Sequence, residues 1–419
     1  MPEVETIEGA ELEPAAGACR VLDLQEYVPH LLPKGDLDEA LGEALWRRHR
    51  TQVAVEFPTV KTEHQWQLTP QGWIGYIVLT DDLHLRLNPK VSLGNLFRML
   101  EYAYKLKIHL ADGLVDCASL EEFYERLAHV LARRVLERAR KGFYRAYVSE
   151  SDTLPYVRGQ LDTRRLITRP WDTRLSCTYE EHTGDIAENQ ILAWTLGRIA
   201  RSGLCTKRVL PTVRTAYRSI QPLVTPVPCT AEACVGRLYN RLNDDYEPLH
   251  GLCRFFLEHS GPHLEAGDRA MLPFLIDMNR LFELFVAEWL AVHLPKSHYI
   301  KAQEHVEITQ TGGLEFIVDL VLYDARDDRP LAVLDTKYKR PTTPASGDIE
   351  QVVAYAVSKQ CSEAVLIYPI ELEKPLDTCV GEQVTVRSAT FALDEDLEAA
   401  GRKLIERILR PASGTTRTP

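Results

Sequence analysis

The chain has 419 residues, which is too long for one ordinary hydrophobic core, so we expect roughly two or three domains. Its 45% hydrophobic and 26% charged residues are typical of globular proteins, and the net charge of −11 argues against tight non-specific DNA binding by the whole surface. No apolar run approaches the length that spans a bilayer, and the acidic start does not resemble a signal or transit peptide. We therefore expect a cytoplasmic protein with no membrane partner. The nine scattered cysteines form no Cys-x-x-Cys pair and are expected to be reduced thiols.

The N-terminal part of the chain predicts a short disordered leader followed by a β-rich domain. Residues 1–14 are rich in Glu and Ala and favour disorder, and residues 15–110 contain segments typical of strands. These segments are residues 52–57, 73–79 and 83–87, of which the last two are joined as a hairpin. Residues 88–103 then lead from a strand end into an amphipathic helix.

Residues 111–262 predict a helical middle region that is partly basic. Ser119 and Glu122, three residues apart, form a capping-box pattern, so a helix is expected over residues 120–142. A basic face here is most often simply solvated, but basic residues near aromatic ones are also typical of phosphate contacts or a docking face. The residues concerned are Arg126, Arg133, Arg134, Arg138, Arg140 and Lys141, with Phe143, Tyr144, Tyr147 and Trp171.

A second polar group lies further along the middle region and contains residue types that bind metals. It consists of Glu180, Glu181, His182 and Asp185. We favour a structural role, because Asp185 with Glu188 three residues later predicts a helix cap ahead of residues 191–196.

Two apolar segments near the C-terminus predict adjacent central strands of a sheet. Residues 314–323 and 331–339 are rich in β-branched and apolar side chains, and the polar residues 324–330 between them are typical of a hairpin turn. An acid lies inside each segment, Asp319 in the first and Asp335 in the second. Burying two carboxylates is costly without a partner, and a divalent cation is the simplest one.

The second of these segments also contains a lysine two residues after its acid. Because side chains alternate between faces along a strand, Asp335 and Lys337 are expected on the same face, and Thr336 between them offers its carbonyl. The pattern Asp319…Asp335-Thr336-Lys337 resembles the motif of PD-(D/E)xK nucleases. A chance motif, or an ion pair with a purely structural role, is the alternative for these residues alone.

The next predicted elements extend this resemblance. Residues 348–357 predict a helix on which Gln351 and Tyr355 lie one turn apart on one face, and residues 363–369 predict a further strand. A Gln-x-x-x-Tyr helix after Asp-x-Lys resembles the RecB-type branch of the same superfamily. The resemblance implies a multidomain protein of α/β plus α+β class whose residues 263–410 form a PD-(D/E)xK restriction-endonuclease-like core, followed by a tail at residues 411–419.

A long amphipathic helix is expected over residues 273–294, ahead of the two acidic strands. The PD-(D/E)xK resemblance implies that an acid on such a helix joins the site, and Glu283 is then the candidate third acid. An ordinary exposed helix glutamate is the alternative.

An ordered set of segments outside the nuclease-like motif resembles the McrC family. The segments are residues 87–91, 95–100, 158–161, 179–185 with Asn189, and 281–283, and the match spans about residues 83–369. Members of that family are nuclease subunits of McrBC-type restriction systems, which act on DNA containing 5-methylcytosine in phage defence. The resemblance implies a McrB-like AAA+ GTPase ring as partner, modified double-stranded DNA as substrate, docking through the N-terminal domain, and self-association when rings are bridged. The chain contains no Gly-x-x-x-x-Gly-Lys-Ser/Thr, so the motor must come from another chain.

The same resemblance implies a role for each candidate site residue. Asp319, Asp335 and the Thr336 carbonyl would hold Mg²⁺, with Mn²⁺ as a substitute, and Lys337 would orient or activate the attacking water. Gln351 would position water or DNA, Tyr355 would brace the site, and Glu283 would be the third acid. The alternatives are a stand-alone DNA repair or processing nuclease, and a non-catalytic regulator of an AAA+ motor.

Overall fold

The structure is a computed structural model in which most of the chain is described. The described residues are 20–80, 82–106, 119–203, 205–259, 274–307, 315–339, 341–381 and 383–410. The expected leader and tail, at residues 1–14 and 411–419, lie outside them. The chain forms two compact units, the first from residues 1–89 with 261–275 and the second from residues 90–260 with 276–419. None of the helices in the described segments combines the length and hydropathy needed to cross a lipid bilayer.

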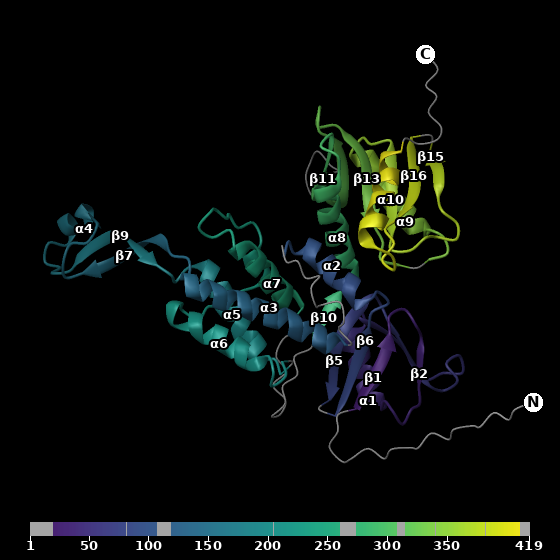
Figure 1. The fold of residues 1–419 in the computed structure, drawn as a ribbon, viewed down its shortest axis with the longest axis horizontal. Coiled ribbons are helices and arrows are strands. Elements are labelled where there is room, and N and C mark those ends of the chain that lie inside the picture. Colours follow the sequence, from purple (N-terminus) through teal and green to yellow (C-terminus); the bar gives the residue numbers. More distant parts are fainter. Residues whose placement is uncertain are drawn as a thin grey trace, which may run out of the picture. The chain divides into compact units, whose positions relative to one another are not determined.

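The first unit is built from two small sheets and one helix (Figure 1). Its elements are β1 (Arg20–Gln25), β2 (His30–Leu32), α1 (Glu39–His49), β3 (Val53–Glu56), β4 (Trp66–Pro70), β5 (Trp73–Thr80), β6 (Leu83–Asn88) and the first two residues of β10 (Phe274–Asp277). The sheets have the orders β1-β6-β5-β10 and β2-β4-β3. The predicted strands at residues 52–57, 73–79 and 83–87 are confirmed, and β5 and β6 form the predicted antiparallel hairpin. Leu45, Trp66 and Leu85 are buried in the core of this unit.

Strand β10 was not predicted, because its residues were expected to form the first turn of the long helix. The helix, α8 (Met278–His293), begins only after Asp277, whose carboxylate accepts hydrogen bonds from the Asn279 and Arg280 backbone N–H groups as an N-cap. Gly75 in β5 shows how closely β10 approaches. Its φ is 126°, and a Cβ at that position would lie 1.8 Å from the Phe274 carbonyl oxygen, so no larger residue fits there.

The second unit begins with helices. These are α2 (Leu93–Ala103), α3 (Leu120–Lys141), α5 (Ala187–Arg201), α6 (Leu210–Ile220) and α7 (Tyr246–His259), with short 3-10 helices at Gln221–Leu223 and Ala231–Cys234. The predicted helix at residues 120–142 is confirmed, and the Ser119 hydroxyl accepts a 3.2 Å hydrogen bond from the Glu122 N–H. The apolar face of α3 packs on α6 and α7, which buries Phe123 and Leu127.

An exposed β-ribbon interrupts these helices where we had expected only helical structure. β7 (Ala146–Leu154) pairs antiparallel with β9 (Leu175–Thr183), β8 (Gln160–Leu161) adds to β9, and α4 (Thr163–Thr168) follows β8. Figure 1 shows α4 at the tip of this ribbon, beyond the ends of α3 and α5. Both long strands are polar and mostly exposed, so they lack the buried apolar alternation by which strands are predicted.

A six-stranded mixed sheet forms the C-terminal part of the second unit. Its elements are β11 (His298–Glu307), β12 (Glu315–Asp324), β13 (Pro330–Thr336), α9 (Ser346–Ser358), β14 (Glu363–Tyr368), β15 (Asp377–Val380), β16 (Val384–Thr390) and α10 (Leu397–Leu409). The strand order is β11-β12-β13-β14-β16-β15. The predicted hairpin, the helix and the following strand are confirmed in the predicted order. Strand β13 ends at Thr336, however, so Lys337 lies just beyond it.

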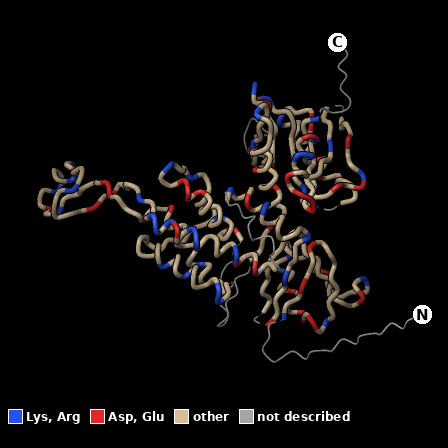
Figure 2. Tube along the Cα trace, in the orientation of Figure 1, with Lys and Arg blue, Asp and Glu red and all other residues tan. Residues whose placement is uncertain are grey.

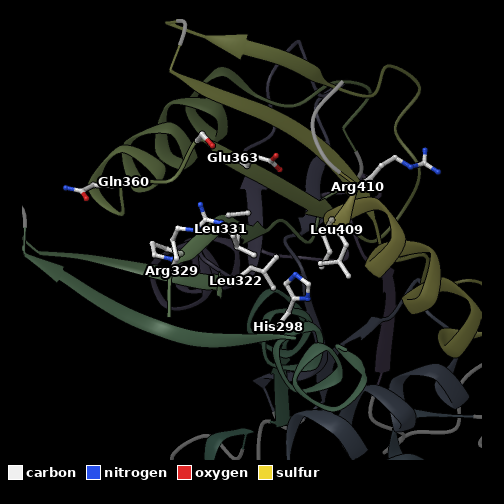
Figure 3. Close-up of a pocket in the computed structure, with 12 residues that line it drawn as sticks. His298, Leu322, Arg329, Leu331, Gln360, Glu363, Leu409 and Arg410 are labelled. Carbon is white, nitrogen blue, oxygen red and sulfur yellow. The ribbon is translucent and has the colours of Figure 1, made fainter. Parts of the chain in front are cut away.

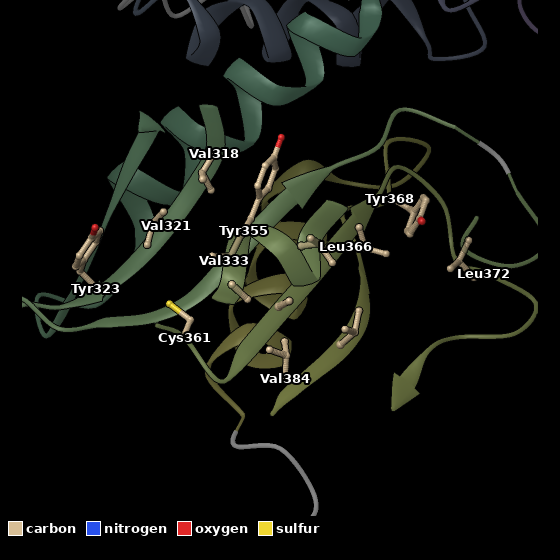
Figure 4. Close-up of a cluster of buried hydrophobic side chains, with 14 residues drawn as sticks. Val318, Val321, Tyr323, Val333, Tyr355, Cys361, Leu366, Tyr368, Leu372 and Val384 are labelled. Carbon is tan, nitrogen blue, oxygen red and sulfur yellow. The ribbon is translucent and has the colours of Figure 1, made fainter. Parts of the chain in front are cut away.

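Helix α9 packs on this sheet over a buried apolar cluster (Figure 4). Val318 and Val333 come from β12 and β13, Leu366 comes from β14, and Val352 and Tyr355 come from α9. This cluster fixes α9 relative to the ends of the central strands.

Helix α2 belongs to the second unit, which differs from the expected domain boundary near residue 110. The Asn95 side chain donates hydrogen bonds of 2.8 and 3.1 Å to the carbonyls of Leu393 and Glu395. The Tyr102 hydroxyl donates a 2.8 Å bond to Glu398 in α10. These contacts explain why the first unit ends at Pro89 rather than after α2.

Candidate active site

The two predicted acids occupy neighbouring positions in the sheet. β12 and β13 are antiparallel, and their pairing register includes Leu320 opposite Leu334. One step further along each strand lie Asp319 and Asp335, so the register places these acids opposite each other. The Thr336 N–H donates a 3.4 Å hydrogen bond to Asp319 Oδ2, which joins the two strand ends at this point.

Asp335 is fully buried, with 0% exposure, and neighbouring charges shift its pKa. The Lys337 ammonium lies 2.8 Å from Asp335 Oδ2 as an ion pair. This ammonium is the cationic partner of the Asp335 carboxylate, and both oxygens of that carboxylate are buried. Burial, together with the negative charge of Asp319, raises the pKa of Asp335 to about 7. The site therefore combines two neighbouring carboxylates with one ammonium, which leaves one negative charge to attract a further cation.

Asp319 and Lys337 are also shifted by this environment. Burial raises the pKa of Asp319 above its ordinary value, although the Thr336 N–H and the Lys337 charge oppose the shift. Burial acts to lower the pKa of Lys337, but the nearby acids Asp335, Asp348 and Asp319 together outweigh it, and the net pKa is raised. Without a bound cation, Lys337 is accordingly protonated at neutral pH.

Helix α9 brings its two predicted residues to the same place. Lys337 Nζ donates a 3.0 Å hydrogen bond to Gln351 Oε1, and Gln351 Nε2 donates a 2.7 Å bond to the Tyr355 hydroxyl. The one-turn spacing of Gln351 and Tyr355 makes this chain of bonds geometrically possible. It fixes the direction of the Lys337 side chain, which is the group nearest to Asp335.

Glu283 lies on α8 and is not an ordinary exposed glutamate. Burial, followed by the charge of Asp319, raises the pKa of Glu283 to about 7, and Asp335 contributes in the same direction. Its Oε1 accepts a hydrogen bond from Gln303 Nε2 on β11. Across the described segments, no three acidic, histidine or cysteine side chains are close enough to form a ready metal cluster, so Glu283 stands beside the acid pair rather than within a three-acid site.

Two further polar groups next to these acids were missed by sequence reasoning. Asp348, in the first turn of α9, is buried and accepts hydrogen bonds of 2.9 and 3.0 Å from Lys339 Nζ. Its charge raises the pKa values of Asp335 and Lys337. Asp335, Lys337 and Lys339 stand at every second position, and this alternation in the sequence could have pointed to Lys339 as a further residue of the site. Gln303 is the other group, and a lone glutamine in a strand gives no signal.

The polar group at residues 180–185 has a structural role, but not the one predicted. Helix α5 begins at Ala187 with Ile186 at its N-cap, and no side chain caps it, so Asp185 is not the cap. The Asp185 carboxylate instead accepts hydrogen bonds from Gln190 Nε2 at 2.8 Å and from the Thr225 N–H at 2.9 Å. It therefore ties the chain after α6 to the start of α5.

The basic face of the middle region is partly neutralised. Figure 2 shows basic and acidic residues interleaved along these helices. Arg126 pairs with Glu122 in the same helix, and Arg138 lies 3.2 Å from Asp245. Trp171, between α4 and β9, is 76% exposed.

A pocket beside the sheet lies away from the acids. It has a volume of about 350 Å³ and includes Arg329, Pro330 and Glu363 in its lining (Figure 3). Pro330 and Glu363 begin β13 and β14, whereas Asp335 and Thr336 end β13. The candidate site and this pocket thus lie at opposite ends of the same parallel strands.

The chain matches one protein family and is similar to chains of two solved structures. Residues 68–369 match the profile of the McrBC 5-methylcytosine restriction system component family. A chain of the refined half-complex from the tetradecameric assembly of Thermococcus gammatolerans McrB AAA+ hexamers with bound McrC is similar with a TM-score of 0.53 and 18% identity, covering 93% of this chain and 100% of that one. A chain of the cryo-EM structure of the Thermococcus gammatolerans McrBC complex gives a TM-score of 0.40 and 19% identity, covering 66% of this chain and 88% of that one. No curated protein matches significantly.

Proposed function

Because the chain belongs to the family of McrBC 5-methylcytosine restriction system components, we propose that it is the DNA-cleaving subunit of such a system. The observation that carries the proposal is the buried Asp335, which lies opposite Asp319 in the sheet and 2.8 Å from the Lys337 ammonium. Two carboxylates and a lysine on adjacent strand ends are the groups that PD-(D/E)xK nucleases use, and the order of strands and helix in this part of the chain agrees with such a core.

The donor set fits a divalent metal ion. Mg²⁺ prefers oxygen ligands and usually takes one or two carboxylates, with water and substrate phosphate completing its coordination. Asp319, Asp335 and the Thr336 carbonyl would hold Mg²⁺, with Mn²⁺ as a substitute. When bound, the ion supplies Lewis-acid polarisation of the scissile phosphate and neutralises developing charge.

The remaining side chains have supporting roles in this proposal. Lys337, held as a cation by Asp335 and directed by Gln351, orients the attacking water and the phosphate oxygens. Tyr355 braces Gln351 through its hydroxyl. Glu283 adds a third negative charge next to the acid pair, without being part of a ready three-acid cluster.

We further propose that the chain docks on a McrB-like AAA+ GTPase ring that recognises methylated duplex DNA. Two features support this partnership. The sequence contains no P-loop motif of its own, and its net charge of −11 gives weak affinity for DNA. The ring would therefore supply both DNA binding and movement, and two copies acting on opposite strands would produce a double-strand break.

Cleavage of duplex DNA by the purified full-length chain, with and without the ring, tests the proposal. With Mg²⁺, GTP and the ring, the chain is expected to cut a methylated duplex and to spare the same duplex without methylation. The chain alone is expected to cut neither at physiological salt. Efficient cutting of unmethylated DNA by the chain alone would support a stand-alone repair or processing nuclease instead, and cutting by neither preparation would support a non-catalytic regulator.

A further inference from the structure

Gln303 has an unusual backbone for a residue in the middle of a strand. It lies in β11 with φ 52°, in the left-handed region that residues other than glycine rarely adopt. Such conformations persist where the surrounding structure enforces them, and they are concentrated at functional sites.

The sheet register places Gln303 in line with the two acids. β11 and β12 pair at Ala302 with Leu320 and at Glu304 with Val318, so the position between these pairs sets Gln303 opposite Asp319. The register of β12 and β13 continues the line to Asp335. Gln303, Asp319 and Asp335 thus form one row across three neighbouring strands.

The Gln303 side chain joins this row to helix α8. Its Nε2 donates a hydrogen bond to Glu283 Oε1, and α8 packs against both β11 and β13. Glu283 has three rotatable side-chain bonds, and this amide contact limits their freedom. The side chains of Gln303 on β11 and Glu283 on α8 are therefore held together beside Asp319.

We propose that Gln303 is a positioning residue for the divalent cation site. It holds the Glu283 carboxylate beside the Asp319–Asp335 pair, so that Glu283 adds to the field that attracts the cation. The inference rests on the proposed function and deepens it. Side chains that orient charged groups around a metal typically change its affinity by about 10- to 100-fold when removed.

The variant Gln303→Gly tests this role with little backbone cost, because glycine adopts a positive φ readily. A matched control is Gln360→Gly, since Gln360 has φ 56° and lies beyond α9 at the pocket away from the acids. The measurement is Mn²⁺ binding to the full-length protein without DNA, followed by electron paramagnetic resonance of the free ion. Gln303→Gly is expected to weaken binding by about 10-fold, and Gln360→Gly is expected to bind like the unmodified protein.

A double-mutant cycle separates positioning from general damage. If Gln303 acts through Glu283, then Gln303→Gly has no further effect on Mn²⁺ affinity in a Glu283→Gln background. An equal loss in both backgrounds, or equal losses for the two glycine variants, would overturn the role of Gln303 while leaving the cation site intact. If the unmodified protein binds no Mn²⁺, the cation site itself fails, and this inference fails with it.

Discussion

The chemistry of single residues is clearest at Asp335, where burial and a neighbouring negative charge act together. Both raise its pKa to about 7, and Glu283 is raised to about 7 for the same reasons. A raised pKa means that folding favours the neutral acid. The resulting stabilisation is fully present below the ordinary carboxyl pKa, near 4, and is lost as the pH rises through about 7.

This linkage predicts how pH and metal should affect thermal unfolding. In the absence of divalent cations, the unfolding temperature should fall between pH 5.5 and pH 8. Added Mg²⁺ should raise it more at pH 8, where the acids are ionised, than at pH 5.5, where protons compete with the cation. Differential scanning fluorimetry of the full-length protein measures both effects. An equal Mg²⁺ shift at the two pH values would contradict metal binding by these carboxylates.

Residues that a short motif links could be expected to lie together, whereas contacts between distant segments could not. The structure places Asp319, Asp335 and Lys337 side by side, and a chain of hydrogen bonds joins Gln351 and Tyr355 to Lys337. Gln303 could not be predicted, because neither its φ nor its contact with Glu283, 20 positions earlier in the chain, leaves a local pattern.

Elements with an apolar face were predictable, and polar ones were not. The hairpin of β12 and β13 and helices α3 and α9 bury regular apolar stripes, so their periodicity revealed them. The ribbon of β7 and β9 is mostly exposed and carries no such stripe. Strand β10 has only four residues and precedes a helix directly, so it resembled part of that helix.

The contact of α2 with the C-terminal part of the chain is expected to contribute to stability. Asn95→Ala removes the donor for the two carbonyls of Leu393 and Glu395, and the free energy of unfolding should fall by about 1–2 kcal/mol. Arg98→Ala on the same helix removes an exposed pair with Asp396 and should cost less than about 1 kcal/mol. Urea denaturation compares them. Equal costs would mean that Asn95 does not hold α2 in place.

The two compact units of the molecule do not follow the order of the sequence. The first unit takes its strand β10 from beyond the helical region, so it is assembled from two distant segments. The sequence suggested a simple boundary at residue 262, because residues 258–262 contain turn-forming residues typical of a break between domains. Pairing between β5 and β10 is a long-range contact, which no local composition reveals.

Cutting the chain at that boundary should therefore damage the first unit. A fragment of residues 1–262 lacks β10, so one edge of β5 has no pairing strand. The unfolding temperature of this fragment should be lower than that of the same fragment carrying residues 274–277 on a flexible linker. With Trp171 and Trp194 replaced by Phe in both fragments, tryptophan fluorescence reports the unfolding of this unit through Trp46, Trp66 and Trp73. Identical unfolding temperatures would show that β10 contributes nothing to its stability.

The central claim is that the acid pair cleaves DNA, and DNA cleavage by the full-length Asp335→Asn variant in the presence of the ring, GTP and Mg²⁺ tests it most directly. Asp327→Asn is the matched control, because Asp327 is an acid in the exposed turn that joins the same two strands. The account predicts that Asp335→Asn still stimulates GTP hydrolysis by the ring but leaves methylated duplex DNA uncut, while Asp327→Asn cuts like the unmodified chain. Cleavage by the folded Asp335→Asn protein at the unmodified rate would contradict it.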